Sequence, residues 1–431
     1  MIGAVVRERA AGARVGQNAG MRRNVVLMIV AGLLAGSCGS SGDEATGSTA
    51  PTVTAASTVA PSTAAPTTAA PTTDVPVEQL AINHVQVIGS HNSYHLKPQP
   101  AAFDAITAVS SELAESIEYS HRPLTEQLEQ FGIRQFELDV FADPEGGLYA
   151  NRVANAVIGL DPLAPEPELQ LPGYKVLHTQ DYDYETTCLT LVACLGEIEA
   201  WSDDNPDHLP VMVLIEIKTQ SVPDAAAAEG IELTIDLPWT TPLAMTPELL
   251  DALDAEIASV FPPAGLVTPD DVRGDAPTLE AAVLDDGWPA IADSRGKVLV
   301  ALNNTGEIRA LYTDGRPSLE GRPMFTSAEP GDPDAAFVRF DDPSSDGLVD
   351  AVEAGYLVRT RTDSPTADAR LNRTTAREQA FASGAHYLST DYYEPSAYFD
   401  SPYIVEFPGG AIARCNPVSA PPDCSADQIA E

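Results

Sequence analysis

Four separate segments of the chain bring histidines or hard oxygen donors to the ends of short runs rich in Val, Ile and Leu. Such runs predict buried β-strands. Histidine, carboxylate and amide side chains that gather at strand ends can bind a metal ion and transfer protons. The segments are, in chain order, Ser90-His91-Asn92-Ser93, Glu137-Leu138-Asp139, Val176-Leu177-His178 and Glu216-Ile217-Lys218.

The oxygen donors form a set that suits a hard cation. Asn92, Glu137, Asp139 and Glu216 offer one amide and three carboxylates, which favour Ca²⁺, with Mg²⁺ as the alternative, over zinc or copper. Glu137 and Asp139 are two residues apart, so on a strand their side chains point the same way. Taken alone, this spacing is also typical of two solvated charges at a strand end.

Glu216 interrupts an otherwise apolar run from Val211 to Ile217. A lone buried carboxylate is costly, so this one must be paired, protonated or bound to a metal. Lys218 lies on the same side of the predicted strand, two residues on. A Glu216–Lys218 salt bridge is therefore the alternative to a metal site.

His91 and His178 each stand beside candidate metal ligands. Imidazoles titrate near neutral pH, so they can bind phosphoryl oxygens and protonate a leaving alcohol while a cation neutralises the phosphate. We therefore predict that both are catalytic in phosphodiester cleavage. His91 and His95 have the i, i+4 spacing of a zinc site on a helix, but a strand followed by a loop is predicted here, which disfavours zinc.

Short apolar strands alternate with helical patterns from Leu80 onward, which predicts a TIM-type (β/α)8 barrel, regular or irregular. An open Rossmann sheet is disfavoured because no G-x-G-x-x-G follows the first strand. The predicted strands are His84–Gly89, Ile133–Val140, Tyr174–Leu177, Val211–Ile217, Lys297–Leu302, Met324–Ser327, Tyr356–Thr360 and His386–Ser389. The predicted helices are Leu124–Phe131, Leu189–Ser202, Pro247–Val260, Leu279–Leu284, Leu348–Ala354 and Thr374–Ala382.

The first part of the chain predicts export. Residues 1–37 are a signal region in which Arg22 and Arg23 precede an apolar stretch, and Met21 is the expected true start. The pattern resembles a bacterial lipoprotein signal with Cys38 as the lipidated residue; an ordinary secretory signal is the alternative. Residues 38–79 are rich in Ser, Thr, Ala and Pro and predict a disordered linker, and residues 80–431 are expected to form one domain.

Cysteine and charge content support an exported protein that does not bind nucleic acid. The remaining cysteines form two local pairs, which we predict to be disulfides, Cys188–Cys194 and Cys415–Cys424. The formal net charge of −39 repels nucleic acid and anionic membranes unless a cation intervenes. We expect a monomer at the cell surface or secreted from the cell.

The motifs resemble the X-region of phosphoinositide-specific phospholipase C, and more closely its calcium-dependent bacterial relatives. The matching elements are Ser90-His91-Asn92-Ser93-Tyr94, Glu137-Leu138-Asp139, His178 and Ile215-Glu216. The resemblance implies that Asn92, Glu137, Asp139 and Glu216 bind Ca²⁺. It also implies that a ligand carboxylate such as Glu137 deprotonates the inositol 2-hydroxyl, that His91 steadies the phosphoryl oxygens and that His178 protonates the departing diacylglycerol.

The candidate substrate-binding cations are Lys218, Arg359 and Arg361. Residues 358–364 resemble the arginine-bearing seventh strand of the family, and either arginine could contact the head group. The eukaryotic enzymes carry lysines on strand five, whereas this chain reads Val298-Leu299-Val300-Ala301-Leu302-Asn303, which favours unphosphorylated phosphatidylinositol as the substrate. The products would be diacylglycerol and phosphoinositol, by way of a cyclic phosphate.

Two other functions fit the same residues. A glycerophosphodiester or sphingomyelin phosphodiesterase that uses Mg²⁺ could share the barrel. A surface protein that binds calcium without turnover could also keep it, although both histidines and all four ligands are retained. The exact head group, the acyl chains, the identity of the general base and the fate of the cyclic product stay open.

Overall fold

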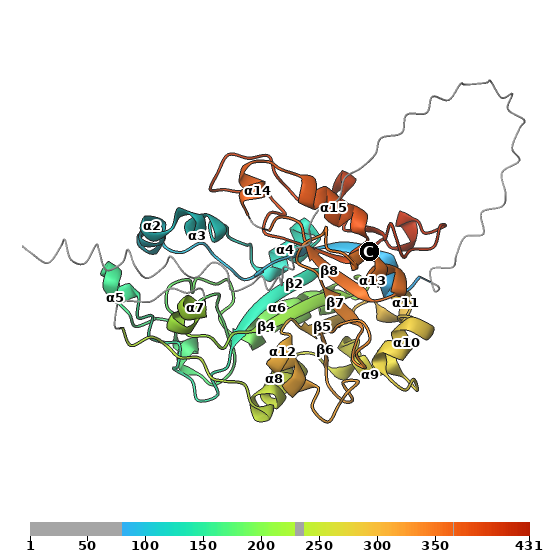
Figure 1. Cartoon of the computed structure of the whole chain (residues 1–431), viewed down its shortest axis with the longest axis horizontal. Helices are drawn as coiled ribbons and strands as arrows, with labels where there is room; N and C mark the ends of the chain where they lie inside the picture. Colours follow the sequence, from blue (N-terminus) through green and yellow to red (C-terminus); the bar gives the residue numbers. More distant parts are fainter. Residues whose placement is uncertain (1–79, 229–236, 365) are drawn as a thin grey trace, which may run out of the picture.

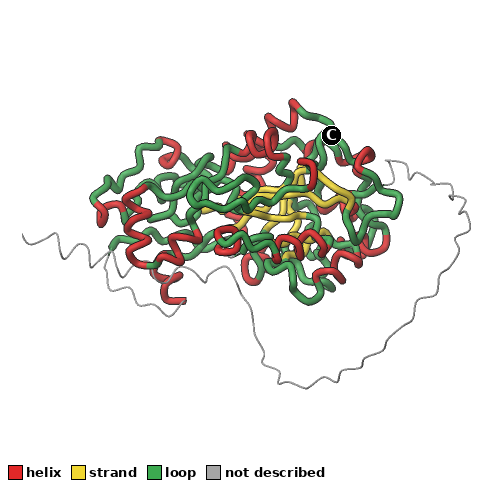
Figure 2. Tube along the Cα trace, turned by 90° about the horizontal axis from the view of Figure 1, so that it is seen from above, coloured by secondary structure: helices red, strands yellow, loops and turns green. Residues whose placement is uncertain are grey.

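Eight parallel strands form the centre of the computed structural model, which describes residues 80–228, 237–364 and 366–431. These strands are β1 (Val85–Ser90), β2 (Gln135–Phe141), β4 (Val211–Ile217), β5 (Val298–Leu302), β6 (Met324–Thr326), β7 (Phe337–Arg339), β8 (Leu357–Arg361) and β9 (Tyr387–Thr390). Their hydrogen-bonded order is β6-β5-β4-β2-β1-β9-β8-β7. A bridge between Ser327 and Phe337 brings β7 back to β6. The predicted TIM-type barrel is therefore confirmed, and Figure 2 shows its strands enclosed by helices.

The barrel consists of two four-stranded halves, β6-β5-β4-β2 and β1-β9-β8-β7. Strands β2 and β4 pair along the whole of Gln135 to Val140, whereas β1 and β2 share the single pair Gly89↔Gln135. A Cβ atom at Gly89 would lie 2.0 Å from Gln135 Oε1, so glycine permits this close approach. The two halves are joined by one such pair here and by the Ser327–Phe337 bridge at the other seam.

One of the predicted barrel strands is wrong and one was missed. The expected strand Tyr174–Leu177 is the two-residue β3 (Lys175–Val176), which pairs antiparallel with the end of β2 and lies outside the barrel. The missed strand is β7, which lies between β6 and β8 and has three residues, too few to give a strand pattern. A further strand, β10 (Ala413–Cys415), pairs antiparallel with β1 and was not predicted.

Helices surround the barrel, and all six predicted helices are present within two residues of their expected ends. Three of them begin at a threonine whose hydroxyl accepts a backbone N–H, at Thr190, Thr246 and Thr278, as expected for N-caps. The α-helices are α2 (Pro100–Val109), α3 (Ser111–Ser116), α4 (Leu124–Phe131), α5 (Asn155–Ile158), α6 (Leu191–Asp204), α7 (Val222–Ala228), α8 (Pro247–Val260), α9 (Pro269–Arg273), α10 (Leu279–Asp285), α11 (Ile291–Ser294), α12 (Gly306–Tyr312), α13 (Leu348–Ala354), α14 (Ala367–Arg370) and α15 (Thr375–Ser383). Short 3-10 helices are η2 (Ile82–His84), η3 (Pro167–Gln170), η4 (Pro263–Gly265), η5 (Pro408–Gly410) and η6 (Ala426–Gln428).

The segments that follow the carboxyl ends of β1, β2 and β4 gather at one end of the molecule. Helices α2 and α3 follow β1, α5 follows β2 and α7 follows β4. All four lie together on the left of Figure 1, away from α9, α10 and α11. In barrels of this class the carboxyl ends of the strands carry the active site, so these segments surround its mouth.

Both predicted disulfides are confirmed: Cys188 is bonded to Cys194, and Cys415 to Cys424. Bonds of this kind form in oxidising compartments, as expected for an exported protein. Within the residues that the structure describes, no helix has the length and apolar character needed to cross a bilayer. The predicted signal region, Cys38 and the linker lie outside the described residues.

The Cys415–Cys424 disulfide is expected to stabilise the attachment of β10 to β1. Replacing both cysteines with serine should lower the free energy of unfolding by about 2–3 kcal/mol, the entropy of closing so short a loop. Urea unfolding at equilibrium would measure this loss. Wild type with its disulfides reduced is the control and should be at least as unstable as the double variant. An unchanged midpoint in the double variant would contradict the prediction.

Candidate active site and metal centre

Three carboxylates meet at the mouth of the barrel because β2 and β4 are in register. Asp139 is the ladder partner of Glu216, and Glu137 lies two residues before Asp139 on the same face of β2. One oxygen from each carboxylate lies within 4.8 Å of the others. The side chains of Glu137 and Asp139 are buried. The structure thus brings together three of the four predicted ligands.

Lys218 and Asn303 occupy the spaces between these carboxylates. The Lys218 ammonium lies 2.6 Å from Glu216 Oε1 and 3.1 Å from Asp139 Oδ2. The Asn303 amide nitrogen donates to Glu216 Oε2 at 2.7 Å and lies 3.4 Å from Glu137 Oε1. The salt bridge between Glu216 and Lys218, which the sequence suggested as an alternative, is therefore present.

The pKa values of Asp139 and Glu216 are shifted in opposite directions. Burial raises the pKa of Asp139 to about 7, against the opposing charge of Lys218. Burial also works to raise the pKa of Glu216, but the charge and hydrogen bond of Lys218 outweigh it and bring that pKa to about 2. Asp139 is therefore the carboxylate whose negative charge is least well compensated by the protein.

The residues at the mouth fit a hard cation. Both carboxylate oxygens of Asp139 are buried without a well-formed hydrogen bond among the described residues, and carboxylate oxygens are the ligands that Ca²⁺ prefers. Asn92, the fourth predicted ligand, follows β1 with a φ of 44°, a left-handed conformation that asparagine tolerates better than most residues. Its amide nitrogen donates to Tyr119 Oη at 3.2 Å, which fixes the orientation of the side chain.

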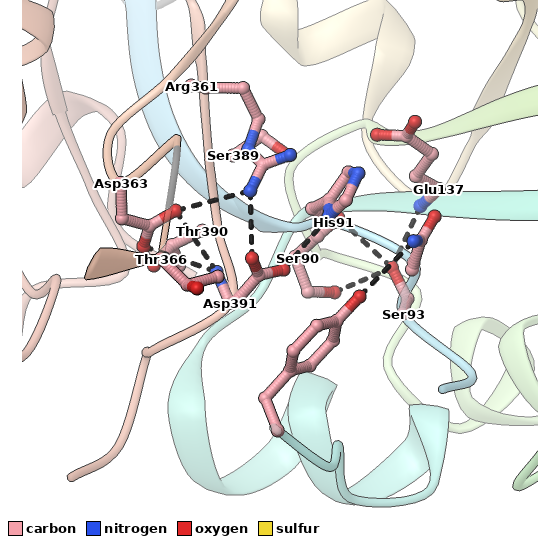
Figure 3. Close-up of polar contacts among 12 residues, drawn as sticks. Ser90, His91, Ser93, Glu137, Arg361, Asp363, Thr366, Ser389, Thr390 and Asp391 are labelled. Carbon is pink, nitrogen blue, oxygen red and sulfur yellow. Dashed lines mark hydrogen bonds and ion pairs between the residues drawn. The ribbon is translucent and has the colours of Figure 1, made fainter. Parts of the chain in front are cut away.

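His91 is paired with a buried aspartate at the end of β9. Its Nδ1 lies 2.9 Å from Asp391 Oδ1, and the histidine side chain is 22% exposed. Figure 3 shows Arg361 reaching from β8 toward both Asp391 and Asp363. Asp363 in turn accepts hydrogen bonds from Thr390 and from the backbone N–H of Asp391. Asp391 is therefore held in place from three sides.

His178 is the outer member of a chain of three side chains. Its Nδ1 lies 2.6 Å from Asp183 Oδ2, and His95 Nε2 lies 3.0 Å from Asp183 Oδ1. His95 and Asp183 are fully buried, whereas the His178 side chain is 25% exposed. The rings of His95 and His178 meet edge to face, with centroids 5.5 Å apart. Asp183 and His95 therefore fix the orientation of His178.

The pKa values of His91 and His178 are shifted in opposite directions. Burial, together with the charge of Arg361, lowers the pKa of His91, although Asp391 opposes this. Burial also lowers the pKa of His178, but the hydrogen bond and charge of Asp183 outweigh it, so that pKa is raised above 6.5. At neutral pH, His91 is suited to accept a proton and His178 to donate one.

The predicted arginines of β8 are both buried and paired. Arg359 contacts Glu137 Oε2 at 2.5 Å, Asp341 Oδ1 at 2.7 Å and Ser389 Oγ at 3.2 Å. Arg339, at the end of β7, is less engaged: its side chain is 26% exposed, and its ion pair with Asp341 is 3.9 Å long. The positive charge of Arg339 contributes, after that of Lys218, to the lowered pKa of Glu216.

Sequence reasoning missed five residues of this mouth. Asp391 stood at the predicted carboxyl end of β9 without an assigned role, and Asn303 was considered only as part of a strand without lysines. Arg339 was missed together with its strand. His95 was considered only as a zinc ligand with His91, and Asp183 was not considered, because neither residue falls at a predicted strand end. The short separation of Asp183 from His178 along the chain could have suggested a contact. The missed residues are His95, Asp183, Asn303, Arg339 and Asp391.

Comparison with protein families matches residues 80–417 to the sequence model of Ca²⁺-dependent phosphoinositide phospholipase C. The chain belongs to this family. It is therefore a phosphodiesterase, with phosphoinositide phospholipase activity and dependence on Ca²⁺ as the properties of its family. Comparison with curated protein sequences gave no match.

Solved structures of bacterial phospholipases C are similar to the chain in fold. The calcium-dependent phosphoinositol-specific enzyme of a Pseudomonas species is 18% identical and covers 79% of this chain and 97% of its own, with a TM-score of 0.47. The Ca²⁺-dependent phosphatidylinositol-specific enzyme of Streptomyces antibioticus is 18% identical, covers 73% and 95%, and has a TM-score of 0.45. The phosphatidylinositol-specific enzyme of Listeria monocytogenes is 12% identical, covers 74% and 92%, and has a TM-score of 0.40.

Replacing Asp183 with asparagine should lower the pKa of His178 below 6.5, because burial would no longer be opposed by a negative charge. Histidine ring resonances followed by NMR across pH would measure this directly. A pKa of His178 that stays raised in Asp183→Asn would contradict the assignment of its cause. Asp224→Asn is a suitable control because Asp224 contacts Ser221 at a different part of the mouth.

The same substitution predicts a pH-dependent loss of stability. Because the folded-state pKa of His178 is raised, its stabilising charge is present below about pH 6.5 and is lost as the pH rises through the folded-state value. Breaking a buried pair of this kind costs about 3 kcal/mol. The difference in unfolding free energy between wild type and Asp183→Asn should therefore be largest near pH 5–6 and shrink toward pH 9.

Proposed function

We propose that this enzyme cleaves phosphatidylinositol into diacylglycerol and phosphoinositol through a cyclic phosphate intermediate. The proposal rests on two histidines, His91 and His178, whose pKa values are shifted in opposite directions beside one acidic cluster. His91 interacts electrostatically with Glu137, and His178 with Asp139. An acid and a base that both interact with one acidic cluster match an attack on phosphorus followed by loss of an alcohol.

We assign the metal site to Asn92, Glu137, Asp139 and Glu216. When Ca²⁺ is bound there, it neutralises the phosphate and lowers the pKa of the attacking hydroxyl. The three carboxylates supply the charge that a divalent cation needs, and the two buried oxygens of Asp139, of which Oδ2 lies 3.1 Å from the Lys218 ammonium, are the strongest support for the site. Mg²⁺, the alternative metal, accepts less variation in ligand geometry.

The contacts support His91 rather than Glu137 as the group that accepts the proton of the inositol 2-hydroxyl. Glu137 Oε2 already accepts a hydrogen bond from Arg359 at 2.5 Å, so this oxygen is not free to take a proton from the substrate. His91 has a lowered pKa, and Asp391 orients its ring and can stabilise the imidazolium that forms. His178, protonated and oriented by Asp183, then delivers a proton to the oxygen of diacylglycerol as it leaves.

The mouth favours an inositol ring without phosphates. Strand β5 is apolar throughout and is followed by Asn303, so an amide that already contacts two carboxylates stands at its end. Arg359 and Arg361 are neutralised by acidic partners, and they shape the head-group site rather than neutralise extra phosphates. Arg339 is the guanidinium best placed to bind the phosphodiester itself.

We propose that the enzyme is exported and tethered to the cell surface through Cys38, with residues 80–431 as its catalytic domain. The two disulfides support an oxidising location. A tether would hold the mouth near membranes despite the formal net charge of −39, which otherwise opposes contact with anionic lipid. We treat the enzyme as a monomer.

Release of water-soluble phosphoinositol from phosphatidylinositol vesicles tests the proposed function. Wild type should be inactive in chelator and regain activity with Ca²⁺. His178→Ala should lose roughly a hundredfold to ten-thousandfold in kcat, because it removes the general acid. His84→Ala, at a histidine outside the barrel mouth, is the control. No release with any metal would sink the proposal, and turnover of glycerophosphodiesters or sphingomyelin with Mg²⁺ would identify the alternative activity.

Arg339→Ala should raise KM for phosphatidylinositol several-fold and reduce kcat less, because it removes a contact to the substrate anion without changing the acid or the base. The fold should be unaffected, since the ion pair of Arg339 with Asp341 is 3.9 Å long and the arginine side chain is 26% exposed. Arg373→Ala, at an arginine paired with Asp368 on the surface, is the matched control. An unchanged KM in Arg339→Ala would refute the assignment.

A further inference from the structure

Lys218 occupies the position at which a cation would bind Asp139 and Glu216. We propose that Lys218 is a built-in counter-ion that Ca²⁺ must displace, and that it thereby sets the Ca²⁺ concentration at which the site fills. The inference rests on the metal site of the proposed function. It adds a regulatory role for a residue that does not itself bind the metal.

The contacts of Lys218 are those that a metal ion would replace. Its ammonium donates to Glu216 Oε1 at 2.6 Å and lies 3.1 Å from Asp139 Oδ2. These contacts use the oxygen lone pairs that a cation at 2.3–2.6 Å would need. The two carboxylates cannot bind the ammonium and the metal ion at once, because two positive charges would then lie a few ångströms apart in a partly buried site.

The ammonium can leave while the backbone stays in place. The backbone N–H of Lys218 donates to Val140 O at 2.9 Å, so the residue remains anchored directly after β4. Its side chain is 27% exposed, which leaves a path to solvent. Arg359, by contrast, is 2% exposed and is held by Glu137, Asp341 and Ser389. Lys218 is therefore the cation that moves and Arg359 the one that stays.

The net charge of the cluster favours the exchange: three carboxylates with Lys218 and Arg359 carry one net negative charge, and with Arg359 and a divalent cation they carry none. In the absence of metal, Lys218 and Arg359 are the two cations in contact with Glu137, Asp139 and Glu216. When Lys218 leaves, three carboxylates and one guanidinium carry two net negative charges, which a divalent cation neutralises. An exchange of ammonium for Ca²⁺ thus avoids both an uncompensated cluster and an excess of positive charge.

The exchange gives the enzyme a Ca²⁺ threshold. Without a counter-ion, the buried carboxylates would repel one another, which would weaken the metal-free fold and tighten Ca²⁺ binding. With it, the metal-free fold is stabilised, and Ca²⁺ binds only at concentrations high enough to overcome the ammonium. Lys218 therefore lowers the affinity of the site for Ca²⁺ and stabilises the metal-free protein.

Isothermal calorimetry with Ca²⁺ on the folded chain, without substrate, tests the inference. Lys218→Met keeps the aliphatic length and removes the charge, and it should bind Ca²⁺ at least tenfold more tightly than wild type. In chelator it should melt at a lower temperature, and Ca²⁺ should raise its melting temperature by more than that of wild type. Both readouts are independent of activity.

Lys97→Met is the matched control. The Lys97 ammonium lies 2.6 Å from Glu118 Oε1, with side chains 20% and 15% exposed, so it is a comparable ion pair away from the acidic cluster. Its loss should leave Ca²⁺ affinity unchanged. If Lys218→Met does not fold in chelator, Lys218→Arg provides the test, because a guanidinium that grips both carboxylates should weaken Ca²⁺ binding.

The outcomes separate this inference from the proposed function. Wild type that binds Ca²⁺, with equal or weaker binding by folded Lys218→Met, would overturn the inference and leave the metal site intact. Unaltered binding by Lys218→Arg would overturn it as well. Wild type that binds no Ca²⁺ would overturn the metal site of the proposed function, and this inference with it.

Discussion

The pairing of β2 with β4 in register is the constraint on which the rest of the site depends. It puts Asp139 beside Glu216 and brings Glu137 within reach of both. Three carboxylates so close together at the mouth of a packed barrel are stable only if positive charge or donors surround them. The side chains of Lys218, Arg359 and Asn303 meet that need.

The same need for compensating charge explains the histidine–aspartate pairs outside the acidic cluster. Asp391 and Asp183 are buried carboxylates, and each is neutralised by neighbours that include a histidine. For Asp183, burial would raise the pKa, but His95 and His178 hold it well below its usual range. His91 and His178 thereby acquire a fixed orientation and a shifted pKa. The orientations and pKa shifts of the two histidines are thus a consequence of how the barrel accommodates buried charge.

Sequence reasoning succeeded where one element carried its own signal. The apolar runs predicted seven of the eight barrel strands, and the spacing of Glu137 and Asp139 predicted their shared face. It failed where the decisive fact was a contact between distant segments. The pairing of His91 with Asp391 spans the chain, and Asp183 is five residues from His178 in an irregular loop with no periodic pattern. Strand β7 was missed because three residues cannot establish a period, and Tyr174–Leu177 was mistaken for a barrel strand because its apolar pattern says nothing of its direction.

The two halves of the barrel divide the catalytic groups between them. His91, Asp391 and Arg361 belong to the half built from β1, β7, β8 and β9, whereas the three carboxylates, Lys218 and His178 belong to the other. The halves share one ladder pair at Gly89 and one bridge at Ser327, and backbone hydrogen bonds from Arg134 to Ile88 and from Ser93 to Glu137 close the β1–β2 seam further. The positions of His91 and His178 are consequently set by two different sets of strands. A substrate that contacts both histidines would therefore span the seam between the two halves of the barrel.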